Sequence, residues 1–170
     1  IFRNESNLGL TKSLNKLISN TNTTYVARQD ADDVSDIYRL ERQIKFLEDN
    51  NLDACSTRAY IKETNKVTPS KSFYLPNRLT MRFKNPFVHG TLLIKKQVLD
   101  EIGSYNEKFY YSQDYKMMWD LLNKNYKVKI LKESLYYLNM KGNISVNKKQ
   151  QQKYYAECVR KNIIPSELNI

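Results

Sequence analysis

Three carboxylates fall within four positions in the segment Asp30-Ala31-Asp32-Asp33, directly after a short apolar run that ends at Ala27. Carboxylates held this close together repel one another unless they share a cation. Their oxygen atoms suit a hard divalent ion such as Mg²⁺ or Mn²⁺. A strand that ends in such residues places them beyond the carboxyl edge of a sheet, where open α/β folds bind ligands. The alternative is a solvated acidic turn that caps the following helix.

Helical and extended segments are predicted to alternate around this turn. We expect a helix before it, because apolar residues recur on one helical face at Leu10, Leu14, Leu17 and Ile18. Residues 24–29 are predicted to form the strand that leads into the turn. A second helix is expected to follow, with Ser35 as its N-cap and Asp36 at its positive end. The buried stripe of that helix is predicted to consist of Ile37, Leu40, Ile44 and Leu47.

The remaining chain continues this alternation. Strands are predicted over residues 53–58, 91–94, 128–131 and 135–138, and helices over residues 95–102, 112–122 and 147–161. Ser112 is expected to cap one of these helices, and Gly103 to end another at the C′ position. Residues 62–80, which contain Pro69 and Pro76, are predicted to be an irregular connection. The predicted fold class is therefore α/β.

Several short motifs occur in a fixed order along the chain. The first block reads Tyr25-Val26-Ala27-Arg28-Gln29-Asp30-Ala31-Asp32-Asp33 and continues with Arg39-Leu40-Glu41. The second contains Asn85-Pro86-Phe87-Val88-His89-Gly90-Thr91, Ile102-Gly103-Ser104-Tyr105 and Gln113-Asp114-Tyr115, and a weaker third contains Leu135-Tyr136-Tyr137 with Asn143-Ile144-Ser145. Over residues 7–146 this series resembles the middle of a family 2, GT-A-type glycosyltransferase of the bacterial kind that builds surface polysaccharide.

This resemblance implies a donor site around the acidic turn, with Mn²⁺ or Mg²⁺ as the cofactor. Asp32 is the expected direct metal ligand, and Asp30 is expected near the metal's waters or the nucleotide ribose. Asp33 either joins the metal site or caps the helix. His89, the single histidine of the chain, is expected to contact the donor phosphate or the metal, unless its role is structural. Arg28 could reach a phosphate, or it could be an outward-facing strand residue.

Asp114 is the candidate catalytic base. The resemblance places the base in an acidic-Asp-Tyr motif at a helix start, and here Gln113 replaces the usual preceding acid. An acceptor hydroxyl needs a base, because it holds its own proton too tightly at neutral pH. A base opposite the leaving group implies inversion at the anomeric carbon. The alternative role of Asp114 is to stabilise the helix N-terminus.

The resemblance also predicts which part of the fold the chain represents. We expect a GT-A-like, Rossmann-related mixed sheet flanked by helices and truncated at the N-terminus. The nucleoside-binding strand-helix-strand unit usual in the family would precede residue 1, in a longer chain or in a partner chain. Residues 1–146 are expected to form the partial catalytic domain, and residues 147–170 a basic C-terminal helix and tail.

Charge is distributed unevenly along the 170 residues. Residues 1–60 contain 8 Lys and Arg against 9 Asp and Glu, whereas residues 61–170 contain 20 against 9. A basic second half could meet an anionic membrane, an acidic glycan or a nucleic acid, but the scattered pattern favours a solvated surface. No apolar run is long enough to span a membrane, and Cys55 and Cys158 match no metal or redox spacing. We therefore expect a cytoplasmic setting, with the inner face of the plasma membrane as an option.

These expectations combine into one hypothesis of function and two rivals. The hypothesis is an inverting, metal-dependent glycosyltransferase that moves a sugar from a nucleotide donor, UDP first among them, to a growing surface polysaccharide or lipid-linked glycan. The first rival is an inactive remnant that binds nucleotide or a partner chain without turnover. The second is a basic nucleic-acid-binding module, which only the charge supports and which leaves the motif series unexplained.

Overall fold

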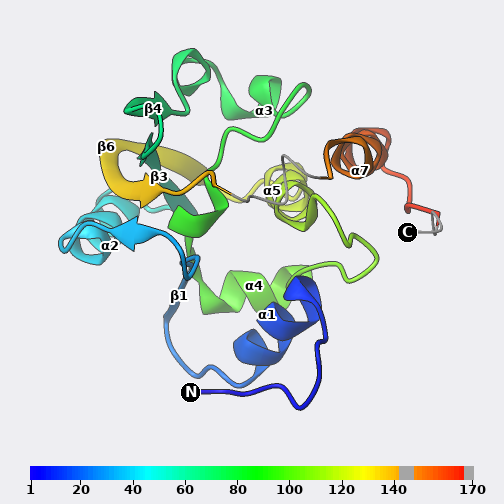
Figure 1. Cartoon of the computed structure of the whole chain (residues 1–170). Helices are drawn as coiled ribbons and strands as arrows, with labels where there is room; N and C mark the ends of the chain where they lie inside the picture. Colours follow the sequence, from blue (N-terminus) through cyan, green and yellow to red (C-terminus); the bar gives the residue numbers. More distant parts are fainter. Residues whose placement is uncertain (142–147, 167–170) are drawn as a thin grey trace.

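The computed structural model describes residues 1–141 and 148–166, and these form a mixed sheet with helices packed on it (Figure 1). The strand order is β1-β5-β3-β6-β2, with β4 paired to β3 off this path. In chain order the strands are β1 (Tyr25–Ala27), β2 (Val34–Ser35), β3 (Ala54–Ile61), β4 (Lys66–Thr68), β5 (Leu93–Lys95) and β6 (Val128–Leu138). The long central pair β3 and β6 is parallel, and the other described pairs are antiparallel.

Alternation along the central strands gives the sheet two buried faces. Successive side chains of a strand point to opposite faces, so Ala54 packs with one apolar cluster and Cys55 with the other. The same division separates Ile94 from Leu93 in β5. Because both faces are buried, β3 is buried continuously over residues 54–57, and the run Leu92-Leu93-Ile94 at β5 is continuously apolar rather than alternating.

The larger core lies between the sheet and four helices, all of which are labelled in Figure 1. These helices are α1 (Leu10–Ser19), α4 (Lys96–Ile102), α5 (Gln113–Asn123) and α7 (Lys149–Lys161). The predicted end of α4 is confirmed, since Gly103 adopts the left-handed conformation with φ 79°. The two strands predicted over residues 128–138 are one continuous strand, β6, whose pairing with β3 shifts register midway.

Helix α2 (Arg39–Asp49) covers the other face, and its predicted buried stripe is wrong in its first half. Ile37 is 86% exposed and Leu40 is 45% exposed, whereas Arg39 and Gln43 are almost fully buried. Ile37 lies outside the helix, because the chain first forms β2 and pairs there with β6. Arg39 and Gln43, one turn apart, instead face the sheet and bind backbone carbonyl groups.

The predicted N-cap at Ser35 is wrong, because Tyr38 precedes α2, whereas Ser112 does occupy the N-cap position of α5 but makes no side-chain capping hydrogen bond. The Ser35 hydroxyl, in β2, donates a hydrogen bond of 2.5 Å to Oε1 of Gln29. Asp36 accepts the backbone N–H two residues further on, just before α2 begins. The Ser112 hydroxyl donates to the carbonyl oxygen of Gln152 in α7, at 3.2 Å. The Ser35 hydroxyl therefore joins β2 to the acidic turn, and the hydroxyl of the N-cap residue Ser112 joins α5 to α7.

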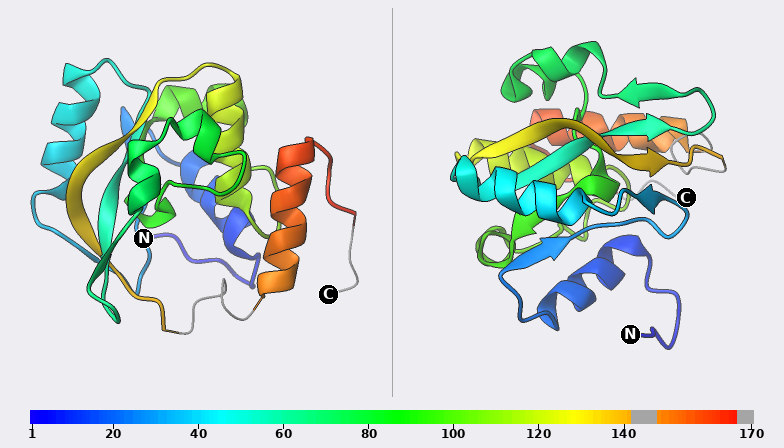
Figure 2. Two further views of the ribbon diagram at one scale, coloured as in Figure 1. Left: turned by 90° about the horizontal axis from the view of Figure 1, so that it is seen from above. Right: turned by 90° about the vertical axis from the view of Figure 1, so that its left-hand side faces the viewer.

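Residues 62–80 are expected from the sequence to be an irregular connection, but the segment 62–88 contains several short elements. These are β4, the 3₁₀ helix η1 (Lys71–Tyr74) and helix α3 (Asn77–Thr80), followed by the 3₁₀ helix η2 (His89–Thr91). Figure 2 shows β4 and the segment after it at the end of the molecule opposite to α1.

Helix α7 packs against α5, and its residues Tyr155, Cys158 and Val159 complete the larger core. The predicted domain boundary at residue 146 and the motif Asn143-Ile144-Ser145 lie outside the described residues. The division into a catalytic domain and a tail therefore stays a prediction. Within the described part of the chain, no helix is both long and apolar enough to cross a membrane.

Candidate functional site

A cleft of about 710 Å³ opens beyond the end of β1 and brings the predicted site residues together. Its lining includes all five of them: Arg28, Asp30, Asp32, His89 and Asp114. They come from the acidic turn after β1, from η2 and from the first turn of α5. A single cleft that receives carboxylates, an imidazole and a guanidinium from distant parts of the chain is the best candidate for a functional site.

The acidic turn has a defined geometry, because its backbone is held at both ends. The N–H of Asp30 donates to the hydroxyl oxygen of Tyr136 at 3.0 Å, and the N–H of Asp33 donates to the Asp30 carbonyl at 3.3 Å. The Arg28 side chain, only 12% exposed, forms an ion pair with the Asp30 carboxylate. Arg28 is therefore not the outward-facing strand residue that the sequence left open.

The remaining two carboxylates of the turn differ in environment. Asp33 is buried, and its Oδ1 accepts the N–H of Asn139, just after β6, at 2.7 Å. Burial raises the pKa of Asp33, although hydrogen bonds from Asn139 and Tyr136 oppose that shift. Asp32 is exposed at the cleft, and Nζ of Lys62 lies 3.4 Å from its carbonyl oxygen. Asp33 thus ties the turn to the sheet and does not cap α2, while Asp32 faces solvent.

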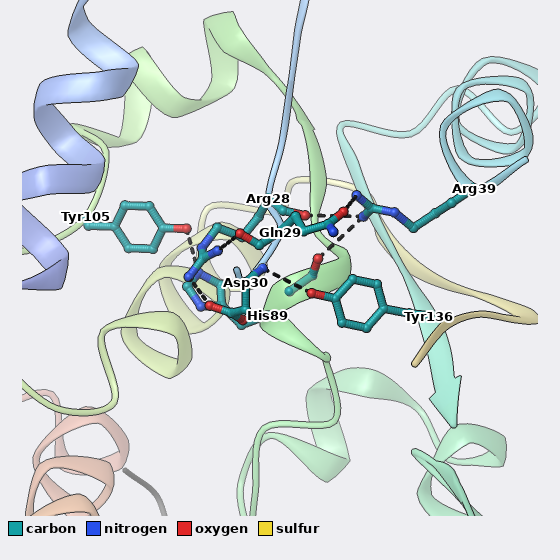
Figure 3. A network of polar contacts seen from close by, with 8 residues as sticks. Arg28, Gln29, Asp30, Arg39, His89, Tyr105 and Tyr136 are labelled. Atoms are coloured by element: carbon teal, nitrogen blue, oxygen red, sulfur yellow. Dashed lines mark hydrogen bonds and ion pairs between the residues drawn. The ribbon is translucent and has the colours of Figure 1, made fainter. Parts of the chain in front are cut away.

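The buried guanidinium of Arg39 stabilises the acidic turn through hydrogen bonds, a role that the sequence alone does not predict (Figure 3). Its Nη1 donates to the carbonyl oxygens of Arg28 at 3.2 Å and of Gly90 at 3.4 Å, and its Nη2 donates to Oε1 of Gln29 at 3.3 Å. The guanidinium also lies 5.4 Å from the ring centroid of Tyr136. Burial lowers the pKa of Arg39. One side chain therefore links the start of the acidic turn to the segment that carries His89.

His89 lies between the acidic turn and α5. Its Nε2 is 2.7 Å from the Tyr105 hydroxyl, and the two rings meet edge to face (Figure 3). Burial lowers the pKa of His89, and the neighbouring charges act on it as well: Asp114 and Asp30 raise the pKa and Arg28 lowers it. Burial therefore favours the neutral imidazole, which lies within electrostatic range of both the acidic turn and Asp114.

Asp114 is half-buried in the first turn of α5. Its Oδ2 accepts a hydrogen bond of 2.9 Å from the side-chain amide of Asn85. A carboxylate at this position also interacts favourably with the positive end of the helix, which is the structural alternative for Asp114. The geometry leaves both roles open, because the same carboxylate lines the cleft.

Position 90 has no room for a side chain, so glycine is required there. A Cβ atom at this position would lie 2.5 Å from the Tyr136 hydroxyl and 3.0 Å from Oδ2 of Asp30. Any side chain would therefore push against the turn that carries the carboxylates. The Asn85–Thr91 motif supplies the site with a close backbone approach as well as with His89.

The carboxylates fit a divalent ion that is shared with a ligand. Asp30 and Asp32 offer oxygen donors at the cleft, but no group of three or more His, Cys, Asp or Glu side chains in the described ranges converges on a metal position. Mg²⁺ is commonly held by one or two carboxylates, with water and substrate phosphates completing its shell. The donor set therefore suits a phosphate-bridged ion rather than an all-protein metal centre.

The fold defines the class of protein. The structure of Staphylococcus aureus TarS, residues 1–349, in complex with UDP-GlcNAc is similar, with a TM-score of 0.70 and 14% sequence identity. The match covers 95% of this chain and 48% of that one, so the chain has the GT-A fold of glycosyltransferases.

The sequence comparison identifies the family. The profile of Glycosyl transferase family 2 matches residues 1–106, and the chain belongs to this family. A glycosyltransferase of Methanocaldococcus jannaschii is 30% identical over 147 residues, which are 79% of this chain and 48% of that protein. The amylovoran biosynthesis glycosyltransferase AmsE of Erwinia amylovora is 30% identical over 162 residues, covering 92% of this chain and 59% of that one. The chain thus spans about half the length of the curated relatives it matches.

Proposed function

We propose that the chain forms the metal and acceptor side of an inverting glycosyltransferase, which transfers a sugar from a UDP donor to a growing surface polysaccharide or a lipid-linked glycan. One observation carries this proposal: Asp30 and Asp32 of the acidic turn line the same cleft as Asp114 of α5, which is distant in sequence. The names of relatives support the chemistry, since AmsE is named for amylovoran biosynthesis and TarS was solved with UDP-GlcNAc.

The acidic turn is proposed to hold Mn²⁺ or Mg²⁺ together with the donor diphosphate. When bound, such an ion offsets the negative charge that develops on the departing diphosphate. Asp32 is the proposed ligand because it is exposed at the cleft, and Asp30 is proposed to contribute beside it. Arg28 holds the Asp30 carboxylate in position before the ligand arrives, and its guanidinium, which also lines the cleft, is proposed to bind a phosphate oxygen of the donor.

Asp114 is proposed to remove the proton from the acceptor hydroxyl. A base must lie within hydrogen-bond reach of that hydroxyl, and Asp114 is fixed at the cleft by Asn85. Attack on the side opposite the diphosphate inverts the anomeric carbon. The neutral His89 is proposed to contact the donor phosphate as a hydrogen-bond donor.

The complete enzyme is proposed to contain a further strand beside β1, from a preceding segment or from a partner chain. β1 pairs with β5 along one edge, and no described strand pairs with its other edge. An apolar pocket of about 190 Å³ lies next to it, between α1 and the sheet. We call this chain together with the proposed further segment the complete enzyme, and propose that it works in the cytoplasm.

The test is a thermal-shift titration of the chain with UDP, in the presence and absence of Mn²⁺. Saturation at about 100 times the dissociation constant stabilises the folded state by roughly 2.7 kcal/mol, which raises the melting temperature by about 5–10 °C. Asp32→Asn is expected to abolish the Mn²⁺-dependent part of the shift. Asp49→Asn, an exposed carboxylate on α2, is the matched control and should keep it.

The rival functions give different results. An inactive remnant would show the UDP shift, yet the complete enzyme would transfer no sugar from any UDP-sugar. A nucleic-acid-binding module would bind RNA or DNA with an affinity that falls steeply with salt and does not depend on Asp32. A UDP shift that is the same with and without Mn²⁺ would remove the metal from the proposal.

A further inference from the structure

The segment of residues 69–84, which we call the projection, leaves the sheet at the cleft and returns to it. Thr68, the residue before it, lines the cleft. Asn85, the residue after it, binds Asp114. Figure 2 shows the segment standing out from the sheet, at the end of the molecule opposite to α1. Whatever contacts the projection therefore lies close to the cleft.

Large apolar side chains of the projection are exposed. Phe83 is 75% exposed, Tyr74 is 72% exposed, and Leu75 and Leu79 are 50% and 45% exposed. Single exposed apolar residues are common on protein surfaces, but four large ones within ten positions make the projection a candidate interaction surface.

The charge of this region has one sign. Between Glu63 and Asp100 the sequence contains no acidic residue. Lys71, Arg82 and Lys84 are exposed, and none of them forms an ion pair with a described carboxylate. Along the projection, the exposed apolar side chains thus lie among solvent-exposed basic side chains.

Contacts with α5 and the residues just after it anchor the projection. Its outer side chains therefore have a fixed direction. Met81 is buried, and its carbonyl oxygen accepts a hydrogen bond from the Tyr115 hydroxyl of α5. Arg78 donates to the carbonyl oxygen of Leu122 and to Oδ1 of Asn125, both at 2.6 Å. Helix α3 therefore turns one side to the protein body and leaves Leu79 on the other side.

We propose that the projection binds an anionic phospholipid surface, with Tyr74, Leu75, Leu79 and Phe83 entering the headgroup layer and Lys71, Arg82 and Lys84 meeting the phosphates. Aromatic and leucine side chains beside lysines and arginines are typical of protein segments that lie in the membrane interface. An acidic glycan or a nucleic acid would match the charge, but neither would bury two leucines. The lipid surface satisfies both features.

This surface would set the position of the cleft. Because both ends of the projection meet the cleft, docking it on lipid holds the base and the acidic turn within reach of an acceptor that is anchored in the same membrane. The inference goes beyond the proposed function, since it concerns a surface that needs neither nucleotide nor metal.

The test is co-sedimentation of the chain with vesicles of phosphatidylcholine, with and without phosphatidylglycerol. Arg82→Gln/Lys84→Gln is expected to weaken binding to the anionic vesicles by about 25-fold, since each basic side chain near such a surface contributes roughly fivefold. Tyr74→Ser/Phe83→Ser is expected to weaken it by about tenfold or more. The matched controls are Lys12→Gln/Lys16→Gln on α1 and Ile37→Ser before α2, which change charge and exposed apolar area elsewhere.

The outcomes separate the alternatives. Anionic-vesicle binding that both projection variants lose and both controls keep supports the proposal. The proposal is overturned if the projection variants bind anionic vesicles as tightly as the unaltered chain, or if the chain shows no preference for phosphatidylglycerol. Binding to RNA or heparin without any binding to vesicles also overturns it. Each variant keeps the UDP thermal shift of the unaltered chain if it is folded, so failure here is distinct from failure of the proposed function.

Discussion

The side-chain amide of Asn85 donates a hydrogen bond of 2.9 Å to Oδ2 of Asp114. The other end of the same amide is also occupied, because Oδ1 of Asn85 accepts the N–H of Phe87 at 3.1 Å. Because the Asn85 amide oxygen is held by the Phe87 N–H, its NH₂ group points away from Phe87, toward the Asp114 carboxylate. Asn85 therefore fixes which oxygen of Asp114 remains available to the cleft.

Replacing Asn85 with Ala is expected to lower kcat of the complete enzyme about tenfold, since one hydrogen bond to a charged group contributes roughly 1.5 kcal/mol. The UDP thermal shift should not change, because Asn85 lies beside Asp114 and not at the acidic turn. Asn77→Ala is the control: its amide binds the carbonyl oxygen of Val128, away from the cleft. Equal loss of kcat in both variants would count against a positioning role for Asn85.

Arg39→Leu is expected to reduce the free energy of unfolding by about 2–4 kcal/mol. The substitution removes the shared donor of the Arg28 and Gly90 carbonyl groups and leaves both buried acceptors without it. Chemical denaturation measures this loss directly. Arg42→Leu, on the exposed side of the same helix, is the matched control and should stay within about 0.5 kcal/mol of the unaltered protein.

Arg39 also shows where sequence reasoning succeeds and fails. The strand before the acidic turn, the left-handed Gly103 and the basic C-terminal helix follow local rules of propensity and capping, and the structure confirms them. The buried stripe of α2 does not follow such rules. It is polar at Arg39 and Gln43, because those side chains bind backbone carbonyl groups of η2, which is distant in sequence.

The candidate site was predictable to a similar degree. Its carboxylates and His89 stand in recognisable motifs, so the sequence brings them together as candidates. Tyr136 and Asn85 also stand in these motifs, but their roles depend on tertiary contacts: the Tyr136 hydroxyl accepts the N–H of Asp30, and the Asn85 amide donates to Asp114. No periodicity or spacing encodes such contacts.

Gly90→Ala is expected to abolish the Mn²⁺-dependent UDP shift, because its Cβ would displace Tyr136 or the Asp30 carboxylate. Gly103→Ala is an informative control. It has no atom within 4 Å of the added Cβ, but its φ of +79° makes any side chain strained, at a cost of about 1 kcal/mol. We expect this control to lower the melting temperature and keep the Mn²⁺-dependent shift. The idea of a steric requirement at Gly90 fails if the alanine variant binds UDP and Mn²⁺ normally.

His89 is expected to make the protein less stable as the pH falls below about 6.5. Burial lowers the pKa of His89 in the folded state, so the unfolded chain takes up a proton at a pH where the folded chain does not. The unfolded state then binds more protons, and the free energy of unfolding decreases with falling pH, by at most roughly 1.4 kcal/mol per pH unit. Above that range both states are neutral at this residue, and the effect vanishes.

The assignment of this slope is simple, because the chain contains a single histidine. Urea unfolding between pH 7.5 and 5.5, values chosen around the histidine range of about 6.5, measures it, and His89→Gln should flatten the curve. Asp33 acts in the opposite direction: burial raises its pKa, so its contribution to stability is present at low pH and is lost as the pH rises through its folded pKa. Asp33→Asn therefore steepens the decline toward low pH or leaves it unchanged, whereas a slope that persists in His89→Gln would show that another group titrates.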